Sequence, residues 1–246
     1  MPDQAVVVVS GLPYSGKSYL LNQMLSNLPE FKDATCLSLD QVRQGLFGER
    51  QDSHITKTEH IFKNHALRYQ ILEKIVLGAS MVVTEAVMLT RNDHQKPFVD
   101  LIAEANRYRS SIEIEASVRD ETPAPQLFSS VHLRVILAYA DAETIRLRAT
   151  QGSSADRLAA ASSVFDLLGA RNAYIGFEFP DSSTYSPLYI NTSASSDAAT
   201  RVRLGEVRAF VLGGMIAEAV IENERREEEA QTAYERVKKM IEDIAR

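Results

Sequence analysis

Residues 11–18 combine glycines, a lysine and a serine at a spacing that can hold a phosphate chain. They read Gly-Leu-Pro-Tyr-Ser-Gly-Lys-Ser, which fits the pattern of a phosphate-binding loop. The glycines let the backbone curl until successive N–H groups point into one concavity. In such a loop Lys17 reaches the β- and γ-phosphates, and the Ser18 hydroxyl binds Mg²⁺. The pattern predicts a nucleotide site formed by Gly11, Tyr14, Ser15, Gly16, Lys17, Ser18 and Tyr19.

The segments on either side of this loop are the ones that it requires. Residues 5–10 are apolar and β-branched, as in a strand that is buried on both faces. After the loop, apolar residues recur at helical spacing until Pro29 ends the run. A helix that starts here adds its positive N-terminal end to the concavity. The flanks favour a nucleotide site over the alternative, a glycine turn with an incidental lysine.

Two further predicted strands carry acids near their ends. Residues 34–40 end at Asp40, and residues 81–89 contain Glu85. In an open α/β sheet the carboxyl ends of the strands border the ligand crevice, so Glu85 would hold Mg²⁺ through water. Asp40 and Arg43 face one cleft if a short helix begins there. The alternative is that Asp40 is only the N-cap of that helix.

Three arginines are candidates for binding phosphate or substrate. Arg91 follows the third strand and lies near the predicted cleft, although a free surface arginine is the alternative. Arg146 and Arg148 follow a fourth strand, residues 131–139, on a helix that Asp141 would cap. Residues 149–157 are small and polar. They suit a mobile lid that excludes water and adds positive charge, with a plain exposed loop as the alternative.

Composition restricts the class of protein and the compartment. The 246 residues suggest one main domain with an appendage, and the apolar and charged fractions are ordinary for a soluble globular chain. We expect no secretory signal, no membrane span and a cytoplasmic location. Cys36 is the single cysteine and lies in a predicted strand, so we expect a core position rather than a nucleophile. A formal net charge of −6 argues against a large nucleic-acid surface.

Alternating strands and helices predict a three-layer α/β/α fold with a mostly parallel five-stranded sheet. Further elements are helices over residues 58–77 and 199–212 and a fifth strand over 188–192. We expect residues 1–212 to form one domain, with an insertion at about 110–130 that includes an edge strand over 112–118. Residues 213–246 form a charged helix with a short heptad-like seam. This helix either packs on the domain or forms a homodimer.

Four motifs in this order resemble those of the P-loop kinases of the polynucleotide kinase and zeta-toxin type. They are residues 11–18, the Asp40-Gln-Val-Arg43 segment, the Val-Val-Thr-Glu85 strand followed by Arg91, and the Ile-Arg146-Leu-Arg148 helix before the lid. The resemblance implies that Asp40 is the general base and that Arg43 binds substrate. It also implies that lid arginines, among them Arg146, Arg148 and Arg157, neutralise the transferring phosphoryl group.

Two residues depart from the pattern of these kinases. Tyr14 stands where a small residue is common in the loop, and Glu85 stands where aspartate is more usual. We expect a Mg²⁺-ATP-dependent phosphotransferase that acts on a hydroxyl of a small molecule, such as a nucleoside, sugar or nucleotide-sugar. The alternatives are a kinase of nucleic-acid 5′-hydroxyl ends, a nucleotide-gated regulator acting through the C-terminal helix, and a nucleotide binder without turnover. We expect a monomer or a homodimer without a membrane partner.

Overall fold

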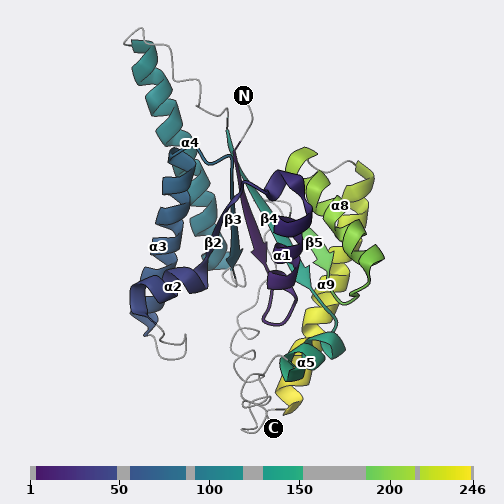
Figure 1. The fold of residues 1–246 in the computed structure, drawn as a ribbon. Coiled ribbons are helices and arrows are strands. Elements are labelled where there is room, and N and C mark those ends of the chain that lie inside the picture. The colour runs from purple at the N-terminus through teal and green to yellow at the C-terminus, as the bar shows by residue number, and fades with distance from the viewer. Residues whose placement is uncertain are drawn as a thin grey trace.

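The five described strands form one parallel sheet in the order β2-β3-β1-β4-β5 (Figure 1). The structure is a computed structural model that describes residues 4–48, 56–86, 92–118, 130–151, 187–213 and 217–244. The strands are β1 (Gln4–Ser10), β2 (Thr35–Ser38), β3 (Met81–Ala86), β4 (Val131–Tyr139) and β5 (Leu188–Asn191). Because every pair is parallel, all carboxyl ends lie at one edge of the sheet. The predicted α/β fold class is confirmed.

Helices cover both faces of this sheet, which gives the expected three layers (Figure 1). One face packs against α1 (Lys17–Asn27) and α8 (Asp197–Gly213). The other packs against α3 (Lys57–Val76) and α4 (Asn92–Val118), with the short α2 (Leu39–Phe47) beside them. The other described helices are the 3-10 turn η1 (Pro29–Phe31), α5 (Ala142–Gln151) and α9 (Ala217–Ile244).

The central strand β1 explains why its sequence is continuously apolar. Val7 and Val9 pack into the cluster under α1 and α8, whereas Val6 and Val8 pack into the cluster under α3 and α4. All four side chains are fully buried. Burial of one such side chain contributes about 1.5–3 kcal/mol. This strand therefore anchors both layers and holds the loop that follows it at the centre of the carboxyl edge.

The C-terminal helix α9 packs against the body of the protein, which is one of the two arrangements expected from the sequence. Its residues Ala230, Tyr234, Val237 and Ile241 are buried, and they are the apolar residues of the predicted seam. They form a cluster with β4 and β5 residues and with α5, which includes Tyr139 and Tyr189. Because this stripe is covered within one chain, it is not available as a dimer seam. The division of the chain at residue 212 stays a prediction.

An asparagine of α9 binds the backbone at strand β5. The Asn223 side-chain oxygen accepts a hydrogen bond from the Tyr189 N–H at 3.0 Å, and its NH₂ group donates to the Pro187 carbonyl at 2.8 Å. Both bonds are buried. Strand β5 ends the described sheet, so its outer polar groups need a partner other than a strand. The side chain of Asn223 supplies that partner.

One predicted strand is helical in the structure. Residues 112–118 belong to α4, whose 27 residues run on to Val118, so the predicted edge strand over 112–118 is wrong. The segment alternates Ile with Glu and Ala. Glu and Ala are good helix formers, and extending an existing helix needs no new nucleus.

Two predictions at strand β2 are also wrong. Cys36 is exposed, not buried in the core, because β2 is an edge strand. The neighbouring Leu37 packs toward α3, but no β2 residue enters the cluster under α1 and α8. Asp40 is not the N-cap of α2. Ser38 is the cap, and its hydroxyl accepts a hydrogen bond from the Asp40 N–H at 3.2 Å.

Some expectations fall on residues that the structure does not describe. Residues 119–129 of the predicted insertion, residues 152–157 of the predicted lid, and Arg91 lie outside the described residues. Among the helices that are described, none combines the length and the apolar character that a membrane crossing demands. The expectation of a cytoplasmic location stays a prediction.

We predict that Asn223→Ala destabilises the fold. Two buried backbone groups at β5 would lose their partner, so the free energy of unfolding should fall by about 1–3 kcal/mol. Urea denaturation measures this difference. The neighbouring Glu224→Ala is the control, because Glu224 is exposed and its loss should change stability by less than about 0.5 kcal/mol. Equal stability of the two variants would contradict the role of Asn223.

Candidate nucleotide-binding site

The loop between β1 and α1 has backbone geometry that requires glycine at two positions. Gly11 has φ of 146° and Gly16 has φ of 85°. A Cβ on Gly11 would lie 2.3 Å from the Ala138 carbonyl oxygen, and one on Gly16 would lie 2.8 Å from the Thr192 hydroxyl oxygen. Tyr14 also has a positive φ of 62°. The loop therefore curls tightly against the ends of β4 and β5, as the sequence pattern predicts.

Lys17 begins helix α1 within this curl. Its side chain is buried, and its ammonium group donates a hydrogen bond to the Leu12 carbonyl at 2.9 Å. Burial lowers the pKa of Lys17, and the Glu85 carboxylate partly opposes this effect. The cation thus lies inside the ring of loop backbone, close to where phosphate charge would be bound.

Ser18 and Glu85 meet at the side of the loop that faces β3. The Ser18 hydroxyl donates a hydrogen bond to Glu85 Oε1 at 3.0 Å. Strand register explains the contact, because Val9 of β1, just before the loop, pairs with Glu85 of β3. A hydroxyl beside a carboxylate is a donor set that fits Mg²⁺, which commonly binds one or two protein groups together with substrate phosphates. Among the described residues, no group of three or more His, Cys, Asp or Glu residues is arranged to hold a metal without such phosphates.

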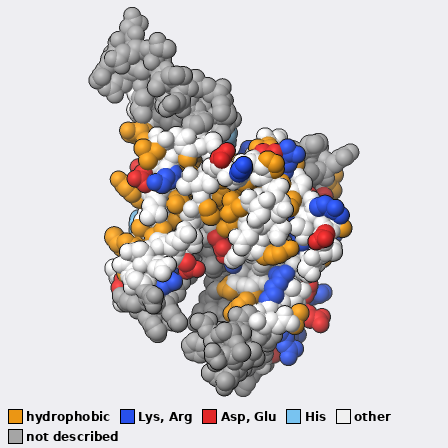
Figure 2. Space-filling view, in the orientation of Figure 1, with side chains coloured by type: hydrophobic (Ala, Val, Ile, Leu, Met, Phe, Trp, Pro, Cys, Tyr) orange, Lys and Arg blue, Asp and Glu red, His pale blue; other side chains and the backbone are white. Residues whose placement is uncertain are grey.

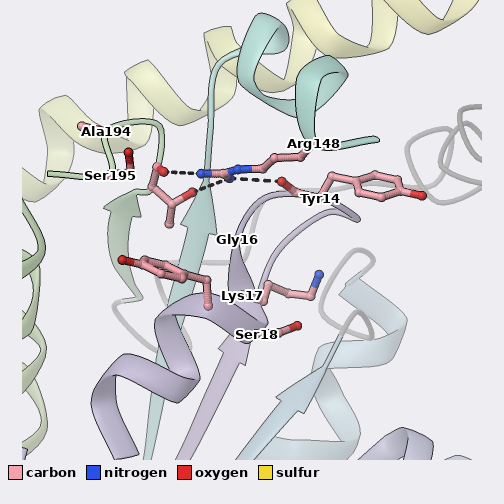
Figure 3. Close-up of a pocket in the computed structure, with 9 residues that line it drawn as sticks. Tyr14, Gly16, Lys17, Ser18, Arg148, Ala194 and Ser195 are labelled. Atoms are coloured by element: carbon pink, nitrogen blue, oxygen red, sulfur yellow. Dashed lines mark hydrogen bonds between the residues drawn. The ribbon is translucent and has the colours of Figure 1, made fainter. Parts of the chain in front are cut away.

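Arg148 of α5 binds the opposite side of the loop. Its guanidinium donates to the Tyr14 carbonyl at 3.2 Å, to the Thr192 hydroxyl at 3.1 Å and to the Thr192 carbonyl at 2.5 Å. The Thr192 hydroxyl in turn donates to the Ser15 carbonyl at 2.5 Å. Figure 3 shows Arg148 and Lys17 on opposite sides of the loop backbone. Arg148 thereby ties α5, the loop and the end of β5 together.

A cavity of about 430 Å³ lies beside the loop on this β5 side (Figure 3). Its lining combines the loop, the start of α1, Arg148, and the segment that follows β5. The residues are Tyr14, Gly16, Lys17, Ser18, Tyr19, Arg148, Thr192, Ala194 and Ser195. The cavity therefore connects the glycine curl to a space large enough for part of a nucleotide.

Asp40 and Arg43 lie on the other side of the loop. Ser38 of β2 pairs with Glu85 of β3, so the start of α2 borders the same edge of the sheet as Glu85. The Asp40 carboxylate lies 3.6 Å from the Arg43 guanidinium. The Asp40 side chain is 80% exposed, whereas that of Arg43 is 18% exposed. The acid is thus accessible to a molecule in solution.

The remaining predicted residues take different positions. Tyr19 is partly exposed and lines the cavity. Ser15 is buried, and its hydroxyl has no hydrogen-bond partner among the residues that the structure describes, which suits a group that binds a ligand. Arg146 is exposed on α5. Asp141 caps α5 as predicted, because its carboxylate accepts a hydrogen bond from the Thr144 N–H at 2.7 Å.

Three cavity residues after β5 escaped the sequence analysis. Thr192, Ala194 and Ser195 are small and carry no charge, so residue type alone did not single them out. Their signal is their position. Thr192 is the last residue of the predicted fifth strand, and Ala194 and Ser195 follow it, at the end of a strand where an open α/β sheet binds its ligands.

Comparison with known proteins agrees with this geometry. Residues 6–122 match a protein family described as an AAA domain. A candidate kinase from Chloroflexus aurantiacus J-10-fl has a similar solved structure, with 17% identity, a TM-score of 0.54, and coverage of 87% of this chain and 100% of the other. The protein APE1195 is similar as well, with 13% identity, a TM-score of 0.55, and coverage of 86% and 98%. This chain has the three-layer α/β/α P-loop NTPase fold that the sequence predicts.

This fold confirms the predicted resemblance at the level of architecture. The sequence has no significant match among curated proteins. Identities of 13% and 17% show the fold of the chain and not its reaction. The roles of single residues in the P-loop therefore stay predictions that rest on the local geometry.

We predict that Gly11→Ala disrupts the loop. The new Cβ would overlap a backbone carbonyl at a φ that alanine avoids, so the free energy of unfolding should fall by about 1–3 kcal/mol and nucleotide affinity should be lost. Gly45→Ala in α2 is the matched control. A Cβ there meets nothing within 4 Å, and alanine favours a helix by up to about 1 kcal/mol. Denaturation and calorimetric titration with ADP measure both properties, and similar results for the two variants would contradict the loop geometry.

Proposed function

We propose that this protein transfers the γ-phosphoryl group of ATP to a hydroxyl group of a small molecule. The observation that supports this most is the strand order, β2-β3-β1-β4-β5. The phosphate loop follows the central strand. The cavity lies toward β5, and the acids lie toward β2 and β3. A nucleotide and an acceptor can therefore approach the loop from opposite sides.

The cavity on the β5 side would bind the nucleoside part of ATP. It continues from Gly16 and Lys17 to Thr192 and Ser195, so a triphosphate in the loop would carry its nucleoside into this space. Lys17 and the loop N–H groups would bind the phosphates. The buried Ser15 hydroxyl has no partner within the described part of the chain and would add one more hydrogen bond.

Asp40 would act as the general base on the other side. In the proposed step it accepts the proton of the acceptor hydroxyl while that oxygen bonds to the γ-phosphorus. The bond from that phosphorus to the β–γ bridging oxygen breaks, and its electrons leave with ADP. Arg43 would hold the acceptor, because its guanidinium is close to the Asp40 carboxylate. Most of the rate enhancement in such a site comes from positioning and charge neutralisation.

Ser18 and Glu85 would hold Mg²⁺ together with the phosphates of ATP. The metal ion would neutralise charge on the β- and γ-phosphates. Glu85 is a longer acid than the aspartate that is usual here, yet its carboxylate contacts the Ser18 hydroxyl. The substitution therefore fits a metal site next to the loop.

Arg146 and Arg148 are the proposed sources of further positive charge. Arg148 makes three hydrogen bonds to Tyr14 and Thr192, so it serves first to fix the loop. Arg146 is exposed on the same helix and would add its positive charge beside the transferring phosphoryl group. This division of roles within α5 refines the expectation that both arginines act on the transferring group.

A small acceptor is favoured over the end of a nucleic acid. The net charge is −6, and Figure 2 shows basic and acidic side chains intermixed over the visible face rather than a basic stripe. Nucleic-acid binding normally relies on a continuous positive surface.

Incubation with labelled ATP and a mixture of nucleosides, sugars and nucleotide-sugars, followed by mass spectrometry, would identify the acceptor. Label found only in free phosphate, changing when a partner protein is added, would instead support a nucleotide-gated regulator.

We predict that Asp40→Asn lowers turnover by about 10²–10⁴, the usual effect of losing a general base, while ATP affinity stays close to that of the wild type. Steady-state kinetics and ATP titration separate the two quantities. Lys17→Ala is the comparison, because it should weaken ATP binding as well as transfer. If Asp40→Asn turned over as fast as the wild type, Asp40 would not be the base.

We predict that Glu85→Gln raises the Mg²⁺ concentration needed for half-maximal activity by about 10-fold to 100-fold, because the amide is a weaker partner of the metal shell. A magnesium titration at saturating ATP measures this shift. Glu143→Gln provides the control, since Glu143 is exposed on α5 and does not line the cavity. An unchanged magnesium dependence in Glu85→Gln would remove Glu85 from the metal site.

A further inference from the structure

Gly11, the first residue of the phosphate loop, packs directly against the Ala138 carbonyl of β4. The last pair between β1 and β4 joins Ser10 to Leu137, so Ala138 lies one residue beyond the paired part of the ladder. Its carbonyl oxygen lies so close to Gly11 that a Cβ there would approach within 2.3 Å. The direction of this carbonyl therefore determines how the first residue of the loop can turn.

A tyrosine from the far end of the chain binds this carbonyl. The Tyr234 hydroxyl of α9 donates a hydrogen bond to the Ala138 oxygen at 2.7 Å. Tyr234 is 4% exposed, and Ala138 is fully buried. Because water has little access, the bond has no ready substitute, and its loss would leave a buried carbonyl without this donor.

Helix α9 also contacts the loop through packing. Leu12 is fully buried in the cluster that contains Tyr234 and Val237, and Tyr14 packs against the same cluster. Helix α5 contributes Ile145 and Ala149 to this cluster. Its Arg148 then donates to the Tyr14 carbonyl. Two routes therefore connect α9 to the loop, one through Ala138 and one through α5.

We propose that Tyr234 is a positioning residue of the phosphate loop, so that the affinity for nucleotide depends on its hydrogen bond to the Ala138 carbonyl. The inference rests on the nucleotide binding proposed above. The hydroxyl holds the Ala138 carbonyl in the direction that leaves room for the turn at Gly11. Without it, the carbonyl reorients toward another donor, and the loop populates conformations that bind phosphate poorly. The apparent affinity for nucleotide then falls in proportion to the fraction of molecules that keep the binding-competent loop.

Other contacts of α9 allow this role to be separated from simple stabilisation. Tyr139 donates a hydrogen bond from its hydroxyl to Glu229 at 3.3 Å, and Asn223 binds the backbone at β5. Both contacts hold α9 on the body. Neither side chain bonds the Ala138 carbonyl or the loop in the contacts described above. They serve as matched controls that weaken the same interface elsewhere.

The test compares Tyr234→Phe with Tyr139→Phe and Asn223→Ala in the full chain. Each tyrosine variant removes one hydroxyl and keeps the ring. Calorimetric titration with ADP and Mg²⁺ measures affinity, and urea denaturation measures stability. We expect Tyr234→Phe to weaken ADP binding by about threefold to tenfold, the equivalent of one net hydrogen bond, while the two controls keep the affinity of the wild type.

Affinity equal to that of the wild type in Tyr234→Phe would overturn the inference. So would a loss of affinity in all three variants that follows their loss of stability. Either result would leave the proposed phosphotransfer intact. By contrast, a wild-type protein without affinity for ADP or ATP would overturn the proposed function, and this inference with it.

Linkage supplies a second readout. If the Tyr234–Ala138 hydrogen bond favours nucleotide binding, bound nucleotide must favour that bond to the same degree. We expect ADP to slow amide hydrogen exchange in residues 230–241 of the wild type and to do so less in Tyr234→Phe. If ADP left the amide exchange rates of residues 230–241 unchanged in the wild type, the coupling would be contradicted.

Discussion

The close approach between Gly11 and the Ala138 carbonyl is the constraint on which the site depends. A loop that holds phosphate with its backbone must turn sharply, and here the turn is made against the end of a neighbouring strand. Only glycine fits at that distance and that φ. The conformation is set from outside the loop as well, since Arg148 and Thr192 bind the Tyr14 and Ser15 carbonyls. The conformation of the phosphate loop thus depends on the ends of β1, β4 and β5 and on helix α5.

The order of strands arranges the chemistry around this loop. Because β1 is the central strand, the loop that follows it has the ends of two strands on each side. On the β3 side, Glu85 meets Ser18 and the exposed Asp40 follows. On the β5 side, Thr192 and the residues after it line a cavity. A parallel sheet brings all these strand ends to one edge. In the proposed reaction the phosphoryl donor and the acceptor would therefore meet over the loop from opposite sides.

The C-terminal helix is part of this arrangement, although it is most distant from the loop in sequence. Its buried stripe forms one cluster with Leu12, and Tyr234 reaches the strand residue that faces Gly11. Elsewhere its Asn223 supplies partners for the backbone around β5. A helix that appears in sequence as a charged appendage therefore serves both to finish the sheet and to support the site.

The sequence by itself determined the features that depend on local pattern. Residues 11–18 predicted the loop, and the sequence predicted the positions of all five strands. The central strands are continuously apolar because a buried parallel strand packs on both faces. Tertiary position decided the rest. Cys36 is exposed because β2 is an edge strand, and the apolar stripe of α9 suited a partner chain as well as its own body. The contacts of Thr192 with the Ser15 carbonyl and of Tyr234 with the Ala138 carbonyl depend on how β5 and α9 pack beside the loop. A pattern specifies which face of an element is buried, whereas the surface that buries it depends on how distant elements pack.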